Sequence, residues 1–588
     1  MPTGRLFAPG SARFVAELAP NRWDIVLLPL VVASLFLVSW GTGQMAQPFR
    51  SGEALPVSLA LGELPGYALR TTLRMAAAML ASLLFTVVYA SLAAKSERLG
   101  RVMVPLLDVL QSVPILGFMS IASVVFMRLF PGSLLGPEFA AIFAIFTSQA
   151  WNMAFSFYSS LRSLPKDLYD VADGFGLSAW QRLWRLELPY ALPQLVWNTM
   201  MSVAGGWFFV VAAEAISVEG YDIRLPGIGS YIALAIQRQD MAAIGWAIAA
   251  MLAVIVATDQ LVFRPLVAWS ERFKFEFGEA RQLPRSWLLD VLRRARATHL
   301  AGVAVGWFWE ASLRPLRGLR ARPVAGRRRS FAEIAAQRSA RLIDRHWSLL
   351  LAIVVVACIV LLARFVQATV AYAEIAQVFL LGLWTALRVA ILVLLASLVW
   401  VPIGIWIGLN ARLAQRVQPV IVFLAAFPAN LIFPLAVTAI LQWRLNPEIW
   451  LSPLMILGTQ WYILFNVIGG AMALPADLRE AAASLGVSRW VAWRRILLPA
   501  ILPAYVTGGL TASGGAWNAS VVAEVVNWGT TTLSASGIGA YIAEQTRIGD
   551  HPRIALGVAV MSLYVVLANR VLWERLYRFV RARFAYTT

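Results

Sequence analysis

The sequence predicts an all-α polytopic membrane protein made of two parallel repeats. Of its 588 residues, 60% are hydrophobic and 14% are charged, whereas soluble domains have roughly 45–50% and about 25%. Apolar runs long enough to cross a bilayer as a helix occur about twelve times. The later runs repeat the earlier ones, and the loop charges place the start of both sets on the same side of the membrane.

The apolar runs follow one another in two sets. The first set covers 23–43, 67–94, 102–130, 138–160, 194–217 and 241–265. The second set covers 347–367, 375–409, 415–442, 450–472, 504–526 and 551–573. Prolines such as Pro114 and Pro428 interrupt several runs, which a membrane helix tolerates where neighbouring helices or water satisfy the freed carbonyl groups. Arginines precede the first run as in a signal peptide, but the many later runs favour an uncleaved first transmembrane helix.

Basic residues gather in alternate loops and predict the orientation. Lys95, Arg98 and Arg101 follow the second run, and a dense arginine cluster follows the sixth. Because cytoplasmic loops favour Lys and Arg, we expect both termini and segment 266–346 to lie in the cytoplasm, with the chain spanning the plasma membrane many times. We attribute the net charge of +19 to these loops rather than to nucleic-acid binding.

The chain is expected to divide into three segments. Residues 1–265 form the first half, 266–346 a basic cytoplasmic linker, and 347–588 the second half. Two interpretations of the linker stay open. It is either an amphipathic helix on anionic headgroups or a partly disordered tether.

Matching residues recur at a nearly constant separation in the sequence, which indicates an internal duplication. The spacing is 310 residues (475 − 165) for Pro165 and Pro475, and 314 (388 − 74) farther upstream for Arg74 and Arg388. A long series of matches at one spacing is the signature of a repeat. Parallel repeats are related by a pseudo-two-fold axis along the membrane normal, and we expect the transport path to run between them.

A polar segment separates the fourth and fifth runs of each half, at 163–191 and 473–501. Alanines favour a helix there, and a glycine lets the chain turn out of it. We therefore predict a helix–turn–helix parallel to the membrane on the cytoplasmic side. The residues that we select as candidates for the function of this loop are Asp170, Ala172, Gly176 and Pro189 in the first segment and Glu480, Ala481, Ala482, Gly486 and Pro499 in the second.

These two segments resemble the EAA loop of ABC importer permeases. The resemblance implies two fused type I importer permease repeats whose loop helices dock on a dimer of ABC ATPase subunits and transmit its closure to the pore. It also implies an extracytoplasmic substrate-binding protein as a partner. The first copy departs from the family pattern, with Asp170 in place of Glu and Val171 in place of Ala, so we expect weaker coupling on that side.

The membrane halves are similar to the permeases of nitrate/taurine/bicarbonate-type importers, specifically to their duplicated single-chain branch. Residues 513–524 and 537–543 carry this resemblance, together with 204–214 and 227–233 in the first half. It implies a small anion such as nitrate, a sulfonate or bicarbonate as the cargo. An importer of ferric iron or thiamine with the same architecture remains an alternative.

Several residues are candidates for the transport pathway. They are Arg74, Arg388, Gly205, Gly206, Trp207, Gly514, Gly515, Trp517, Asn518, Glu214 and Glu524. A paired arginine would attract an anion, and acids inside a membrane are functional candidates. Structural alternatives stand beside each assignment: close helix packing for the glycines and tryptophans, arginines that extend to the headgroups, and glutamates that are hydrated or paired near the outer surface.

The chain lacks the motifs of an ATPase or a membrane enzyme. A P-loop requires a Gly-Lys pair, but Lys95, Lys166 and Lys274 are the only lysines and none follows glycine. We therefore expect ATP and magnesium to be bound by a partner, with no cofactor and no metal site in this chain. A lipid transferase or intramembrane protease is a remote alternative, since the spans lack a catalytic cluster.

Overall fold

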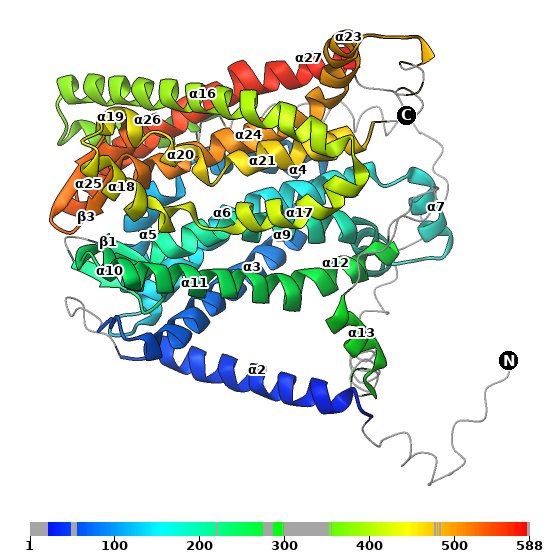
Figure 1. Cartoon of the computed structure of the whole chain (residues 1–588), viewed down its shortest axis with the longest axis horizontal. Coiled ribbons are helices and arrows are strands. Elements are labelled where there is room, and N and C mark those ends of the chain that lie inside the picture. The colour runs from blue at the N-terminus through cyan, green and yellow to red at the C-terminus, as the bar shows by residue number, and fades with distance from the viewer. Residues whose placement is uncertain are drawn as a thin grey trace. The chain divides into compact units, whose positions relative to one another are not determined.

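The computed structural model describes residues 21–48, 56–218, 221–273, 286–296, 298, 352–353, 355–474, 478, 480, 482 and 484–584 (Figure 1). The chain separates into two compact units. The first unit contains the described parts of 1–43, 160–197 and 257–328, and the second contains those of 44–159, 198–256 and 329–588. The unit boundaries do not follow the repeat boundaries.

Helices dominate both halves of the chain. The first half contains α2 (Asp24–Met45), η1 (Leu61–Glu63), α3 (Leu64–Lys95), α4 (Glu97–Ser112), α5 (Ile115–Leu129), α6 (Leu135–Ser163), α7 (Lys166–Gly174), α8 (Ala179–Arg182), η2 (Leu183–Glu187), α9 (Leu188–Glu214), β1 (Ala215–Val218), β2 (Tyr221–Arg224), α10 (Ile228–Gln237), α11 (Met241–Thr258) and η3 (Asp259–Phe263). The elements α12 (Arg264–Ser270), η4 (Glu271–Phe273) and α13 (Trp287–Arg294) follow.

The second half follows a similar order. It contains α16 (Tyr372–Gly408), α17 (Ala411–Ala426), η6 (Ala429–Leu431), α18 (Phe433–Gln442), α19 (Pro447–Trp450), α20 (Leu454–Leu457), α21 (Gln460–Met472), α23 (Arg489–Ala492), η7 (Trp493–Leu497), α24 (Leu498–Ala523), β3 (Val525–Trp528), β4 (Thr531–Ser534), α25 (Ile538–Ile548), α26 (His551–Ala568), η8 (Asn569–Trp573) and α27 (Glu574–Phe584). Here α19, α20 and α21 stand in place of the single helix α6.

Each predicted apolar run is mainly helical in its described residues. Among those residues, seven helices are long and apolar enough to cross a membrane, or up to nine when two bent pairs are counted as single spans. The other three runs form α4 with α5, α6, and a shorter apolar helix at Val355–Gln367. The predicted polytopic α-helical membrane fold is confirmed.

Two of the predicted prolines break their spans at matching places. Val113 and Phe427 are extended, with ψ of 128° and 123°, immediately before Pro114 and Pro428. Proline removes a backbone donor and disfavours helical geometry in the residue before it. The span from α17 to α18 bends by 70° at this break. The breaks divide α4 from α5, and α17 from α18.

The duplication extends to details of the backbone. The π-helical turns η2 and η7 are 310 residues apart (493 − 183), as are η3 and η8 (569 − 259). Short hairpins pair β1 with β2 and β3 with β4 in antiparallel register. The sequence analysis predicted neither feature. The second hairpin turns at Gly529, whose φ of 60° suits a tight two-residue turn.

In the first unit, α13 packs on the start of α2. Val291 and Ala295 cluster with Leu27, and the Asn21 side chain donates a hydrogen bond of 2.7 Å to the Arg294 carbonyl. The arginines at the end of α13 are exposed, while Leu288 and Val291 are buried. The described part of the predicted linker therefore includes an amphipathic helix. Residues 274–285, 297 and 299–346 of the linker lie outside the described residues.

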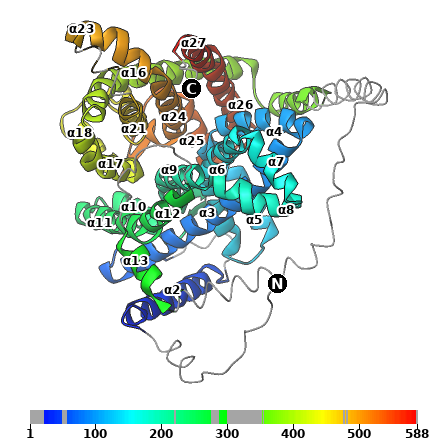
Figure 2. The same ribbon diagram turned by 90° about the vertical axis from the view of Figure 1, so that its right-hand side faces the viewer.

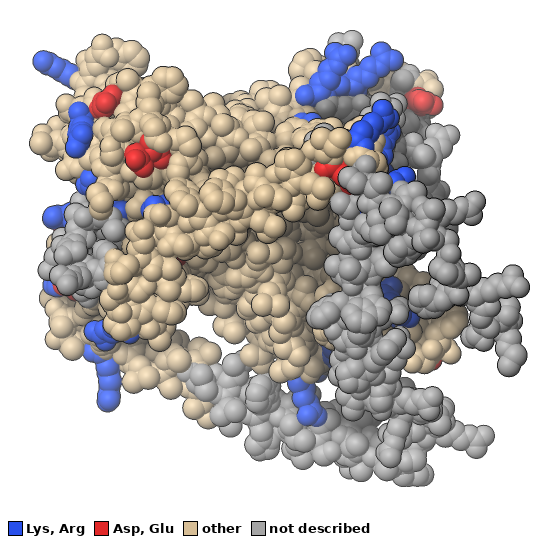
Figure 3. Space-filling view, turned by 90° about the horizontal axis from the view of Figure 1, so that it is seen from below, with Lys and Arg blue, Asp and Glu red and all other residues tan. Residues whose placement is uncertain are grey.

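In the second unit, α21 packs against both α16 and α24, and α26 lies beside α16 (Figures 1 and 2). Small residues permit the close approach. A Cβ on Gly508 would lie 2.7 Å from the Tyr462 carbonyl oxygen. Apolar side chains such as Leu383 and Leu394 of α16 are exposed, as lipid-facing residues are. Figure 3 shows charged side chains gathered toward two ends of the visible surface, with a mostly uncharged stretch between them.

Candidate functional site

The first polar segment folds as the predicted helix–turn–helix. α7 ends at Gly174, Gly176 adopts a φ of 64°, and Leu177 donates a hydrogen bond of 3.1 Å to the Ala172 carbonyl. Ser178 then caps α8 in a capping box with Gln181. Left-handed backbone favours glycine, so Gly176 closes α7 as expected.

The side chains of this segment differ in their exposure. Ala172 is buried, whereas Asp170 is exposed. An ion pair of 2.9 Å from Arg182 to Asp173 joins α8 to α7. Burial, followed by the nearby charge of Glu187, raises the pKa of Tyr169. Pro189 is the second residue of α9.

The second polar segment repeats the turn. Gly486 has a φ of 63°, and Val487 donates to the Ala482 carbonyl at 3.0 Å. Glu480 is exposed, and Pro499 occupies the first turn of α24. Ala481 lies outside the described residues. The two glycine turns therefore have the same geometry.

Each turn presents matching large apolar side chains to its surroundings. Phe175 is 79% exposed, and its counterpart Leu485 (175 + 310) is 81% exposed. Trp180 and Trp490 form a second matched pair of exposed side chains. Exposed apolar groups at corresponding sites are typical of protein interaction surfaces. The sequence analysis did not select these four residues, although their spacing was available.

An ion network that we call the first ion triad lies at the C-terminal end of α9. Arg74 of α3 pairs with Glu138 of α6 through two hydrogen bonds of 2.6 Å, and with Glu214 of α9 through a third of 2.6 Å. All three side chains are buried. The fork of Arg74 is thus occupied by two carboxylates, and Arg74 does not extend to headgroups.

Neighbouring groups complete the coordination of Glu214. The Thr71 hydroxyl donates to it at 2.7 Å, and the Gly229 amide donates at 2.7 Å. The Ile228 amide in turn donates to the Thr71 hydroxyl at 3.0 Å. Two carboxylates and one guanidinium leave a net negative charge, which these donors stabilise. The network fixes the start of α10 against α3 and α9.

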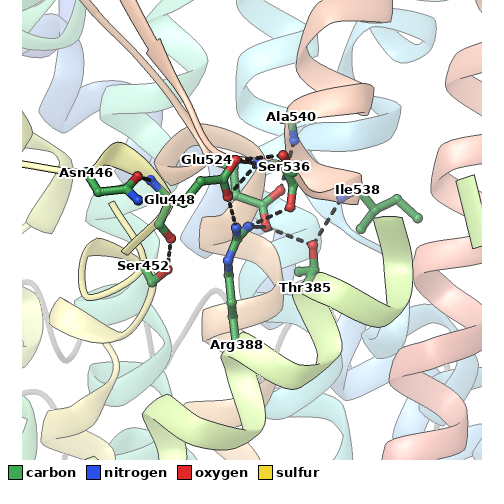
Figure 4. Close-up of polar contacts among 9 residues, drawn as sticks. All are labelled: Thr385, Arg388, Asn446, Glu448, Ser452, Glu524, Ser536, Ile538 and Ala540. Carbon is green, nitrogen blue, oxygen red and sulfur yellow. Dashed lines mark hydrogen bonds and ion pairs between the residues drawn. The ribbon is translucent and has the colours of Figure 1, made fainter. Parts of the chain in front are cut away.

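The second ion triad repeats this arrangement with Arg388, Glu448 and Glu524 (Figure 4). Thr385 donates to Glu524 at 2.7 Å and accepts from the Ile538 amide at 3.0 Å. Arg388 lies 3.4 Å from Glu524, and Glu448 is 44% exposed. This triad is therefore more open than the first.

The Glu138 and Glu448 positions were missed by sequence reasoning. They are 310 residues apart (448 − 138) and open matching segments of the fourth spans. An acid at the start of an apolar run, recurring at the repeat spacing, was a usable signal. Their pairing with Arg74 and Arg388 favours a structural role for both arginines over contact with a passing anion.

Glycines at the starts of α10 and α25 allow these helices to lie close to the two ion triads. A Cβ on Gly227 or Gly537 would overlap the carboxyl group of Glu214 or Glu524. We expect Gly227→Ala to push Glu214 away from Arg74 and lower the free energy of unfolding by about 1–3 kcal/mol. The thermal midpoint of the detergent-solubilised protein measures this loss. Gly245→Ala is the matched control, since a Cβ there meets no atom within 4 Å; equal midpoints for both variants would contradict the expectation.

The remaining pathway candidates lie in the middle of α9 and α24. Trp207 and Trp517 are buried, and Trp517 stacks on Tyr564 at 6.4 Å between centroids. Each of three glycines there faces a side chain. Gly205 faces Tyr462, Gly206 faces Gln149, and Gly515 faces Thr459. Gly514 borders open space instead. Within the described part of the chain, no three His, Cys, Asp or Glu side chains are grouped to hold a metal ion.

The repeats also match a known family of proteins. A family model of the binding-protein-dependent transport system inner membrane component matches residues 82–272 and again residues 400–585, more than half of the chain. The chain belongs to this family. The family domain occurs twice in the chain, which confirms the predicted duplication and the predicted resemblance to fused ABC permeases.

Individual members of the family have related sequences. The nitrate import permease protein NrtB of Leptolyngbya laminosa is 28% identical over 182 residues, 31% of this chain and 62% of that protein. The bicarbonate transport system permease protein CmpB of Synechococcus elongatus is 29% identical over 180 residues, 30% of this chain and 62% of that protein. The glycine betaine/carnitine transport permease protein GbuB of Listeria monocytogenes is 28% identical over 165 residues, 28% of this chain and 52% of that protein. The chain thus spans less than two thirds of the length of each relative.

Proposed function

We propose that this protein is the permease subunit of an ATP-driven importer and forms both halves of its translocation pathway. The observation that supports this most strongly is the pair of glycine turns at Gly176 and Gly486, each with exposed apolar side chains beside it. Such a pair provides one docking element for each subunit of an ATPase dimer. The chain itself then carries out no hydrolysis, and ATP and magnesium bind to the partner.

The membrane placement follows from the same proposal. The glycine turns face the cytoplasm of a bacterial cell, both termini lie on that side, and the hairpins at the far ends of α9 and α24 face outward. A separate extracytoplasmic binding protein delivers the cargo there, because the loops at the hairpins are short.

We infer a small anion as the cargo. Nitrate and bicarbonate permeases are among the relatives. The similarity to a glycine betaine/carnitine permease makes a quaternary ammonium compound the second candidate. Ferric iron and thiamine remain alternatives to be tested in the same way.

Stimulation of ATP hydrolysis identifies the cargo. The chain is purified with its ATPase and binding protein, reconstituted into liposomes, and supplied with nitrate, bicarbonate, a sulfonate, glycine betaine, ferric iron or thiamine. We expect one of the three anions to raise the ATPase rate several-fold. An increase of this size corresponds to the coupling free energies that are typical of linked sites. A response to betaine, iron or thiamine alone would reject the anion proposal and retain the importer.

A further inference from the structure

Each broken span touches the long helix of the opposite half. The Ile115 amide, at the start of α5, donates a hydrogen bond of 2.8 Å to Oδ1 of Asn518 in α24. Nδ2 of Asn430, just after the break in the second half, donates to the Phe208 carbonyl of α9 at 3.5 Å. Phe208 and Asn518 are equivalent positions (518 − 208 = 310). The two contacts therefore join equivalent positions of α9 and α24 to residues that follow the two proline breaks.

The polar side chains in these contacts come from the second half alone. The first half has Phe208 where the second has Asn518, and it supplies only backbone atoms. A third contact follows the same rule: a Cβ on Gly205 would lie 2.6 Å from the Tyr462 hydroxyl. Asn152, the equivalent of Tyr462 (462 − 310), donates instead to Ser202 of its own half at 3.2 Å.

Asn518 lies beside a glycine that has free space around it. Its side-chain nitrogen donates to the Gly514 carbonyl at 3.1 Å, and Gly514 borders open space. Oδ1 of Asn430 is buried and has no hydrogen-bond partner among the described residues. An unpaired buried amide oxygen is costly, so its presence in a native structure calls for an explanation, and a functional role is one such explanation.

We propose that Asn430, Tyr462 and Asn518 form the polar constriction between the halves, and that Asn518 selects the cargo. The inference rests on the proposed transport function. In the closed constriction, Asn518 accepts from the first free amide of α5. When the halves separate, the Ile115 amide and the amide nitrogen of Asn518 become two donors for one small anion. Half-helix N-termini at breaks in membrane helices present donors to anions in this way.

A charge substitution tests the selectivity of this position. Asn518→Asp keeps the shape and the acceptor for Ile115 but places a negative charge in the constriction. We expect anion uptake, as kcat/KM, to fall at least about tenfold, because like charges at close range repel strongly in a low dielectric. Asn152→Asp is the matched control, since it adds the same charge in the first half beside Ser202. Unchanged uptake by the Asn518 variant, or an equal fall in the control, would overturn the proposal.

A labelling experiment tests the location without knowledge of the cargo. The chain has a single cysteine, Cys358, so Cys358→Ser provides a background for Asn518→Cys. We expect a water-soluble thiol reagent to modify this variant at least about tenfold faster than Ala519→Cys, because reactivity follows exposure of the thiolate and Ala519 is buried. Equal rates would reject the constriction. Fast labelling without any response to anions would keep the constriction and reject the anion cargo.

Discussion

Arg74→Met is expected to destabilise the protein more than any other single substitution considered. The variant leaves Glu138 and Glu214 buried side by side without their shared cation. Removing one member of a buried ion pair costs about 3–5 kcal/mol, because the remaining charge stays unpaired. Here two carboxylates lose their partner at once. We expect a large fall in the thermal midpoint of the detergent-solubilised protein and in its yield.

Two comparisons separate the lost pairing from a general effect of the substitution. Arg388→Met removes the equivalent arginine, but Glu448 is partly exposed and water can replace the pairing, so the midpoint should fall less. The triple variant Arg74→Met, Glu138→Gln and Glu214→Gln removes all three charges and should recover part of the loss. A larger effect at Arg388, or no recovery in the triple variant, would contradict this account of the first ion triad.

Gly486→Glu is expected to abolish the coupling of cargo to ATP hydrolysis. Gly486 has a φ of 63°, so any side chain strains the turn by about 1–2 kcal/mol. A Cβ at this position meets no atom of the described residues within 4 Å, so we expect a long acidic side chain to project toward the proposed ATPase. We expect cargo-stimulated ATP hydrolysis of the reconstituted complex to fall at least about tenfold.

The equivalent change in the first half should have a weaker effect. Gly176 has the same φ and the same free space, so the backbone strain of Gly176→Glu equals that of Gly486→Glu. A difference in ATP hydrolysis then reports the docking surfaces, which differ in Asp170 and Glu480. Gly486→Ala, which adds the strain without the charge, is the control for the turn itself. Equal losses in both glutamate variants would refute the asymmetry.

Local sequence signals were sufficient for the spans and the turns. Apolar length predicts a membrane helix because the bilayer excludes unpaired backbone groups, and glycine at 176 and 486 predicts the turn because few other residues adopt a left-handed backbone. Breaks at Pro114 and Pro428 follow from the same local chemistry. These features depend on a few neighbouring residues, so the sequence alone is enough to predict them.

The partners of the charged side chains could not be predicted from local sequence signals. Arg74 was expected to attract an anion or to extend to headgroups, yet it is 64 residues from Glu138 and 140 from Glu214, and all three meet in one buried network. Likewise, Asn518 was a pathway candidate without a partner until folding placed the start of α5 against it. The repeat spacing shows which residues are equivalent between the halves.

The membrane spans, the duplication and the glycine turns were therefore predictable from the sequence alone, because each depends on the length of an apolar run, on residue spacing or on a single backbone preference. Which half supplies the polar atoms at the interface, and how open each ion triad is, depended on packing between distant helices. The halves share a pattern, but the first half contributes the backbone carbonyl of Phe208 where the second contributes the side chain of Asn518. Side-chain contacts across the pseudo-two-fold axis arise only when both halves are folded, and no spacing within one half encodes them.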